Sequence, residues 1–138
     1  MESKQITVVG IGYVGLSLAV LLSQHNKVIA YDIDETRVQK INNNESTIKD
    51  SLIDYYLLNK ELELESTNNK EYAFKNSEFI IIATPTDYDQ ETKFFDTSSV
   101  DKVVEDIFLL NDHATVFIKS TVPVGHTELL RKKYNTDR

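Results

Sequence analysis

The sequence predicts an α/β domain built on a doubly wound parallel sheet. Two observations support this prediction: short apolar, strand-like segments alternate with helical segments along the chain, and the first such unit contains a glycine-rich turn. Alternation of this kind is typical of a parallel sheet with helices on both faces. At 138 residues the chain has the length of one domain, so we expect a single domain over residues 1–138.

The first unit carries its glycines in the context that a phosphate-binding turn requires. Gly10, Gly12 and Gly15 form a G-x-G-x-x-G motif that follows an apolar strand at 6–9 and begins a helix. In such a motif the first glycine allows the tight turn, the second leaves room for a pyrophosphate, and the third lets the helix pack against the strand. The free N–H groups and positive dipole end of the helix then face the phosphates.

An acidic residue follows the second strand, which is expected at 28–31. Asp32 lies twenty residues after Gly12. A carboxylate there accepts hydrogen bonds from a ribose diol and repels a 2′-phosphate, so it favours NAD over NADP. Arg37, five residues further on, is either a solvated helix residue or a group that bridges ribose or phosphate oxygens. An arginine near this acid leaves NADP as an alternative cofactor. The sequence therefore predicts a Rossmann-type NAD-binding domain.

The other elements continue the alternation. The first helix is expected to bury an apolar face at positions i, i+4, i+7 and i+8, made by Val14, Leu18, Leu21 and Leu22. Further helices are predicted at 34–41, 51–58, 71–75, 98–110 and 124–134. Further strands are predicted at 62–65, 79–83 and 115–118.

The expected strand order follows from the fold class. The continuous apolar run at 79–83 is typical of a central strand covered on both faces, whereas the alternating segment 62–65 suits one side of the sheet. The usual order of a dinucleotide fold, 3-2-1-4-5-6, leaves the fifth strand, 115–118, at an edge. Because a sixth strand is expected to follow, we interpret the chain as a fragment of a longer protein. The segment 84–95 is predicted to be a polar loop.

Hydroxyl side chains follow the fourth and fifth strands. They occur in Thr84-Pro85-Thr86 and in the segment 119–123, which contains Thr121. In open α/β sheets ligands bind beyond the carboxyl ends of the strands, where strands one and four diverge. We therefore expect these segments to hold the nicotinamide ribose or to order water near it. A pair of ordinary turns is the alternative, because Thr and Pro also suit turns.

Composition excludes several classes of function. The net charge of −7, from 15 basic and 22 acidic residues, argues against binding to nucleic acid or to an anionic membrane. No apolar run has the length of a membrane span and no signal peptide is present, so a cytoplasmic location is expected. The chain has no cysteine for thiolate chemistry. No metal site is expected, because no metal-binding pattern is formed by His25, His113 and His126.

Five segments resemble the UDP-glucose/GDP-mannose dehydrogenase family, in order and at the family's spacing over nearly the whole chain. They are 10–16, 31–34, 81–87, 95–99 and 118–125. The resemblance implies an enzyme that oxidises the C6 alcohol of UDP-glucose twice, with two NAD, to give UDP-glucuronate. In this family the reaction passes through a cysteine thiohemiacetal and thioester in a second domain.

The resemblance also implies roles for residues of this chain. Val14 would back the pyrophosphate, and Asp32 and Arg37 would hold the adenosine ribose. Thr86 and Thr121 would line the nicotinamide side, where Thr121 would also help to order a catalytic water. The expected cofactor-binding set is completed by Gly10, Gly12, Tyr13 and Gly15.

The family's other catalytic groups have no counterpart in residues 1–138. These are a Glu-bearing segment, a Lys, an Asn and the nucleophilic Cys, together with the dimerisation helix and the UDP-binding domain. We therefore expect this chain to bind NAD weakly at most and not to turn over. The parent enzyme is expected to be a homodimer that takes its nucleotide-sugar substrate in the missing domain.

Two other interpretations stay open. The first is a stand-alone NAD-sensing module, such as the nucleotide domains that regulate ion channels, which does not require the hydroxyl segments after strands four and five. The second is a Rossmann-like scaffold that has lost its ligand, which is disfavoured by the intact Gly10, Gly12, Gly15 and Asp32.

Overall fold

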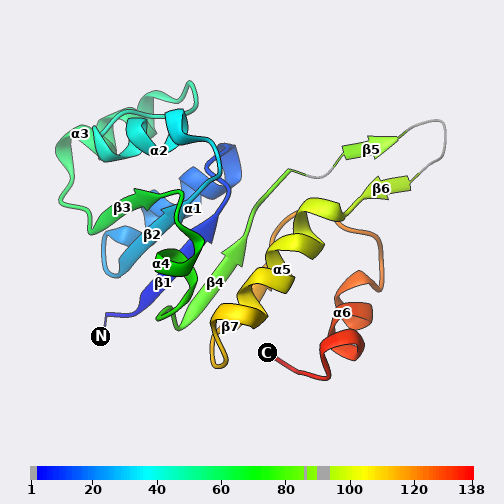
Figure 1. Ribbon diagram of the computed structural model, residues 1–138. Helices are drawn as coiled ribbons and strands as arrows, with labels where there is room; N and C mark the ends of the chain where they lie inside the picture. Colours follow the sequence, from blue (N-terminus) through cyan, green and yellow to red (C-terminus); the bar gives the residue numbers. More distant parts are fainter. Residues whose placement is uncertain (1–2, 86, 90–93) are drawn as a thin grey trace.

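A five-stranded parallel sheet forms the centre of the molecule, in the order β3-β2-β1-β4-β7 (Figure 1). The computed structural model describes residues 3–85, 87–89 and 94–138. The strands of this sheet are β1 (Gln5–Val9), β2 (Lys27–Tyr31), β3 (Leu64–Thr67), β4 (Phe79–Ile82) and β7 (Thr115–Ile118). The predicted order is confirmed, including the return of the chain from β3 past β1 to β4 and the edge position of β7.

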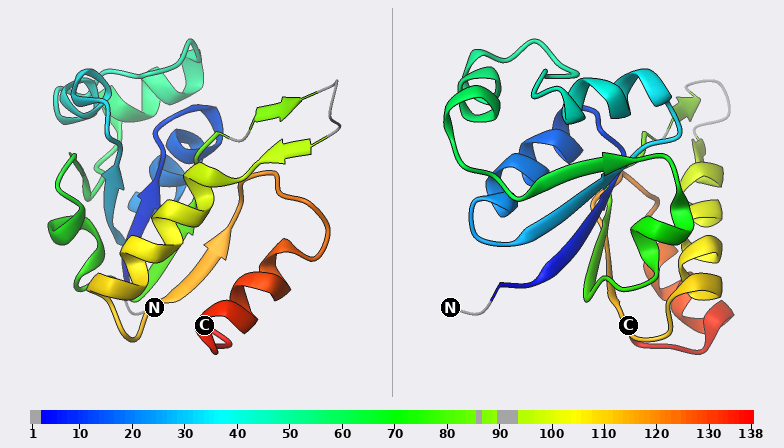
Figure 2. Two further views of the ribbon diagram at one scale, coloured as in Figure 1. Left: turned by 45° about the vertical axis from the view of Figure 1, so that its right-hand side comes forward. Right: turned by 60° about the vertical axis from the view of Figure 1, so that its left-hand side comes forward.

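Helices cover both faces of the sheet (Figure 2). One face carries α1 (Tyr13–Ser23), α2 (Glu35–Asn42) and α3 (Ser51–Asn59). The other face carries α4 (Lys70–Phe74), α5 (Ser98–Leu110) and α6 (His126–Tyr134). All the strands are parallel, and the chain crosses from β3 at one edge to β4 beyond β1, so helices cover both faces and the sheet is doubly wound, as predicted.

The alternation of side chains along β2 divides the core into two layers. Val28 and Ala30 pack beneath α1, α2 and α3, whereas Ile29 and Tyr31 pack against α4 and α5. Successive residues of a strand point to opposite faces, so a strand covered on both sides is apolar over most of its length. All four of these side chains are buried.

The buried face of α1 differs from the prediction. Val14 and Leu21 are 45% and 60% exposed. The helix instead buries the face made by Gly15, Leu16, Ala19, Val20 and Ser23. The helix is apolar on nearly every side, so spacing alone did not single out one face. Gly15 decides the orientation, because only a residue without a Cβ can lie against the Gly10 carbonyl.

Two elements also differ from the prediction by two residues. The third strand is two residues later than predicted, because the Asn42 side-chain amide pairs with both the N–H and the carbonyl of Ser66 and draws this polar residue into β3. The last helix begins at His126 rather than at 124, because Gly125 adopts a left-handed φ of 87° that an α-helix cannot contain.

The predicted polar loop at 84–95 is wrong in part. It contains an antiparallel hairpin of β5 (Asp87–Asp89) and β6 (Phe94–Asp96), which lies apart from the main sheet (Figure 1). The segment has no clear alternation of apolar and polar residues, so its sequence gave no strand signal. The hairpin leads directly into α5.

Candidate cofactor-binding site

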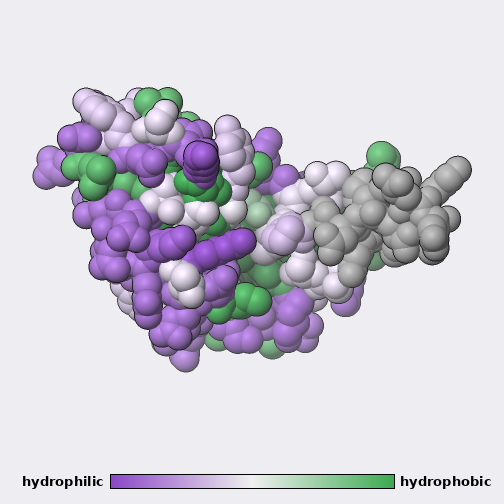
Figure 3. All heavy atoms as spheres, turned by 90° about the horizontal axis from the view of Figure 1, so that it is seen from above, coloured by the Kyte–Doolittle hydropathy of each residue, from purple (hydrophilic) through white to green (hydrophobic). Residues whose placement is uncertain are grey.

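Two adjoining hollows lie at the carboxyl ends of β1 and β4, the position that the fold predicts for a ligand. Their volumes are about 440 Å³ and about 350 Å³. Both are lined by Gly10, Arg37, Thr84 and Pro85, so together they form one elongated depression. Seen from above, this end of the molecule is largely hydrophilic, with apolar residues set between the polar ones (Figure 3).

The three glycines of the turn each have a distinct geometry. Gly10 has a φ of 97°, and a Cβ there would lie 2.7 Å from the Ala83 carbonyl oxygen. A Cβ on Gly15 would lie only 1.7 Å from the carbonyl oxygen of Gly10. A Cβ on Gly12, in contrast, would have no neighbour within 4 Å. Gly10 and Gly15 are therefore required by the fold, whereas Gly12 keeps open the space above the turn.

The amino end of α1 faces that space. Gly12 is the N-cap, and no side chain of the described residues caps the helix. Tyr13 and Val14 are 65% and 45% exposed, and both line the smaller hollow with Gly12. An uncapped helix start presents N–H groups and a positive dipole end, which suit a phosphate.

Asp32 ties the end of β2 to the glycine turn. Its side chain is nearly buried, at 9% exposure. Oδ2 accepts a hydrogen bond from the Ile11 N–H at 2.9 Å, and Oδ1 accepts one from the Asp34 N–H, also at 2.9 Å. The predicted ligand residue is thus also a structural one, which its spacing from the glycines did not reveal.

Arg37 lies within the site rather than in solvent alone. Its Nη1 lies 3.4 Å from Oδ2 of Asp32, and its Nε lies 4.0 Å from Oδ2 of Asp34. The side chain is about half exposed and lines both hollows. This position brings its guanidinium to the place where the two hollows meet.

A cluster of three hydroxyl groups joins the carboxyl ends of β4 and β7 to the start of α5. Ser120 Oγ donates to the Thr84 carbonyl at 2.6 Å, and Ser99 Oγ donates to the Pro85 carbonyl at 2.8 Å. Ser99 Oγ also lies 3.4 Å from Thr84 Oγ1. Sequence reasoning identified the segments but not the roles of Ser99 and Ser120, because these depend on which carbonyls the fold brings near them.

The predicted residues of the nicotinamide side are only partly described. Thr121 is exposed and lines the smaller hollow beside Lys119 and Ser120. Thr86 lies outside the described residues. The structure therefore brings Thr121 together with Gly12, Tyr13 and Val14 around one depression.

The larger hollow extends between β2, α4 and α5. Its walls include Phe74, Val103 and Tyr31, whose ring lies 5.2 Å from that of Phe74. Burial, followed by the nearby carboxylates of Asp106 and Asp32, raises the pKa of the Tyr31 hydroxyl, which stays neutral. This region could not be predicted from the sequence, since α4 and α5 meet it only in the folded chain.

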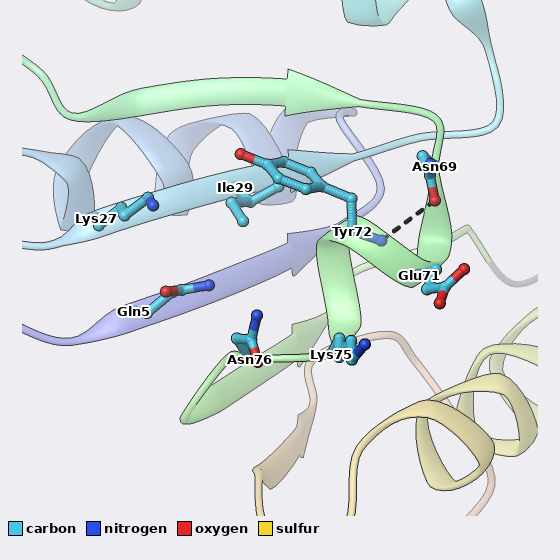
Figure 4. A pocket seen from close by; sticks show the side chains of 8 residues that line it. All are labelled: Gln5, Lys27, Ile29, Asn69, Glu71, Tyr72, Lys75 and Asn76. Carbon is cyan, nitrogen blue, oxygen red and sulfur yellow. Dashed lines mark hydrogen bonds between the residues drawn. The ribbon is translucent and has the colours of Figure 1, made fainter.

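A further hollow lies elsewhere on the molecule and is lined mainly by polar side chains (Figure 4). Gln5 and Lys27 begin β1 and β2, so this hollow includes the amino ends of these strands, away from the glycine turn. Tyr72 of α4 lies beside Ile29 there. We assign no function to it.

Neither a cluster of metal ligands nor a membrane-spanning helix is found among the described residues. Among these residues, no three His, Cys, Asp or Glu side chains gather as metal ligands would. None of their helices combines the length and apolar character needed to cross a bilayer.

Comparison with known proteins identifies relatives for nearly the whole chain. Residues 4–138 match the profile described as UDP-glucose/GDP-mannose dehydrogenase family, NAD binding domain. The chain is 48% identical over 134 residues to a UDP-glucose 6-dehydrogenase of Streptococcus pneumoniae and 47% identical over 133 residues to one of Campylobacter jejuni. These alignments cover 97% and 95% of this chain, and 34% of each relative.

A solved structure shows the same fold. The structure of a UDP-D-ManNAc dehydrogenase from Pyrococcus horikoshii superposes with a TM-score of 0.82 at 29% sequence identity. The superposition covers 97% of this chain and 33% of that one. The chain thus spans about a third of the length of the relatives that it matches.

Proposed function

The chain belongs to the UDP-glucose/GDP-mannose dehydrogenase family, as its NAD-binding domain, and we propose that its parent enzyme oxidises UDP-glucose to UDP-glucuronate with two NAD. The observation that carries the choice of substrate is the 48% identity to a UDP-glucose 6-dehydrogenase across almost the whole chain. The relatives reported above are all dehydrogenases, so a stand-alone NAD-sensing module finds no support among them.

The pyrophosphate of NAD is assigned to the glycine turn. The empty space above Gly12 and the uncapped start of α1 fit a phosphate group that approaches the backbone closely. Val14 and Tyr13 lie beside this position. Gly10 and Gly15 act indirectly, by allowing the turn and the close packing of α1.

The adenosine ribose is assigned to Asp32. Its carboxylate already accepts two backbone hydrogen bonds, which fix its orientation, and its third partner, Arg37, lies at the longer distance of 3.4 Å. A carboxylate has about four acceptor positions, so it can also accept from a ribose diol. Its negative charge disfavours the 2′-phosphate of NADP. Arg37, where the two hollows meet, is placed to contact ribose or phosphate oxygens.

The nicotinamide is assigned to the smaller hollow. When bound, NAD supplies the acceptor for a hydride from the substrate carbon. We assign Thr121 to the nicotinamide side and to the ordering of a water, and Thr86 to the same side from the family resemblance alone. Ser99 and Ser120 would keep the segment that contains Thr84 in place, since they bond its carbonyls.

The substrate-binding and nucleophilic groups are placed outside residues 1–138. This chain has no cysteine, and it spans 34% of the length of each of the two UDP-glucose 6-dehydrogenases reported above. We propose that the parent enzyme is a cytoplasmic homodimer, that its second domain binds the nucleotide sugar, and that residues 1–138 alone do not turn over.

A chimera tests whether residues 1–138 serve as the NAD-binding domain in this reaction. Residues 1–138 replace the corresponding part of the Streptococcus pneumoniae enzyme, and NADH formation is followed with UDP-glucose and NAD. We expect two NADH per UDP-glucose, and none from residues 1–138 alone. A matched chimera with Asp32→Ala should need more NAD for half-maximal rate. A chimera that folds and binds NAD but leaves UDP-glucose unoxidised would contradict the proposal, as would turnover by residues 1–138 alone.

A further inference from the structure

The larger hollow combines apolar walls with two separate groups of charged side chains. One group surrounds the ribose position and consists of Asp32, Asp34 and Arg37, which contact one another. The other group, on α5, consists of Lys102 and Asp106. Between them the lining is mostly apolar, so a flat aromatic base would be enclosed there with a polar pair at its edge.

Lys102 and Asp106 form a donor beside an acceptor. They lie one turn apart on α5, with Lys102 Nζ 3.3 Å from Asp106 Oδ1. Lys70 of α4 reaches the second oxygen, Oδ2, also at 3.3 Å. The Asp106 side chain is 13% exposed, so the carboxylate is held between two helices. Two ammonium partners leave part of its acceptor capacity free.

The Tyr31 hydroxyl is an uncharged polar group in the lining of this hollow. Burial and the Asp106 carboxylate raise its pKa, so it adds no charge to the hollow at neutral pH. Asp106 is therefore close enough to Tyr31 to act on it electrostatically, and both residues line the hollow. This places the carboxylate in the same space as the apolar walls rather than on the outer surface of α5.

We propose that Lys102 and Asp106 recognise the edge of the adenine base and make the site selective for adenine over hypoxanthine. The proposal rests on the cofactor site assigned above. Adenine presents an exocyclic amino donor beside a ring-nitrogen acceptor. This pattern complements a carboxylate beside an ammonium group. Hypoxanthine carries an oxygen in place of the amino group, and this oxygen would face the carboxylate.

A purely structural role for the pair makes a different prediction. The Lys102 side chain is 61% exposed, and exposed ion pairs contribute little to stability. If Lys102 and Asp106 served only to stabilise α5 and, through Lys70, its contact with α4, the two bases would bind equally well and substitution of either residue would not change their affinity ratio. Base selectivity is therefore the property that separates the two roles.

The test compares NAD with nicotinamide hypoxanthine dinucleotide by calorimetric titration of residues 1–138. We expect the hypoxanthine form to bind about tenfold more weakly, as for loss of one charge-assisted hydrogen bond. The Asp106→Asn side chain can either donate or accept, so its preference should fall to about twofold or less. The matched control is Glu105→Gln, because Glu105 contacts Lys102 at 4.0 Å but does not line the hollow. It should keep the preference of the unmodified chain.

A second variant covers the case in which Asp106→Asn fails to fold. Lys102→Met removes the donor from an exposed position, so the fold should tolerate it, and the preference for NAD should again shrink. Equal binding of the two dinucleotides by the unmodified chain would overturn the inference and leave the cofactor site standing. Binding of neither dinucleotide would overturn both.

Discussion

At the scale of single residues, the proposed site depends on a carboxylate that holds the fold together and that we assign to the ligand as well. Asp32 holds the Ile11 N–H of the glycine turn and the Asp34 N–H that precedes α2. Both donors lie at the rim of the site, so the same side chain fixes the shape of the site and, in the function proposed above, accepts from the ribose. A substitution of Asp32 should therefore change stability as well as affinity.

Replacement of Asp32 by alanine should lower the free energy of unfolding by about 1–3 kcal/mol, because it leaves the buried Ile11 N–H and the part-buried Asp34 N–H without their acceptor. Asp32→Asn keeps one acceptor oxygen and should cost less. Urea denaturation measures both, with the exposed Glu61→Gln as the control. An Asp32→Ala variant as stable as the unmodified chain would show that these hydrogen bonds contribute nothing to the fold.

Tyr31 gives the site a dependence on alkaline pH. Its pKa is raised above the ordinary value of 10.0, by burial first and then by Asp106 and Asp32. The folded chain holds this proton more tightly than the unfolded chain. The contribution of the Tyr31 hydroxyl to the free energy of unfolding is therefore complete below pH 10 and is lost as pH rises through the folded-state pKa. Urea denaturation between pH 9 and about 11 should show a smaller loss of stability in Tyr31→Phe. Identical losses in the two chains would contradict this assignment.

At the scale of elements, Gly12 and Gly15 of the glycine turn serve different purposes, although both are glycines of the same G-x-G-x-x-G motif. A Cβ on Gly15 would overlap the Gly10 carbonyl, whereas a Cβ on Gly12 would meet nothing within 4 Å. Gly15 is therefore needed for α1 to pack on the sheet. Gly12 is needed only if a ligand occupies the space above the turn.

The variants Gly15→Ala and Gly12→Ala form a matched pair for this distinction. Gly15→Ala should lower the free energy of unfolding by about 3 kcal/mol or more, because the overlap involves backbone atoms that cannot move aside. Gly12→Ala should stay within about 1 kcal/mol of the unmodified chain but lose NAD affinity, since its methyl group fills the pyrophosphate position. Denaturation and NAD titration measure the two effects. A Gly12→Ala chain that binds NAD normally would place the pyrophosphate elsewhere.

The elements with a strong and unambiguous pattern are those that the sequence predicts best. The ranges 98–110 and 115–118 agree with α5 and β7 at both ends. The buried face of α1 could not be predicted, because a helix that is apolar all round has no preferred face in its sequence. It is set instead by the contact of Gly15 with Gly10.

At the scale of the whole molecule, the site is assembled from segments far apart in the chain, and this limits what the sequence reveals. Asp32 and the glycine turn could be predicted because a fixed spacing joins them. Ser99, Ser120 and Asp106 could not, because their roles depend on tertiary contacts among β4, β7, α4 and α5.

Titration of residues 1–138 with NAD and, separately, with NADP, followed by amide chemical shifts, tests the central claim most directly. The account predicts preferential binding of NAD, with the largest shifts at Gly12, Val14, Asp32 and Thr121. Shifts confined to other residues, a preference for NADP, or no response to either nucleotide would contradict it.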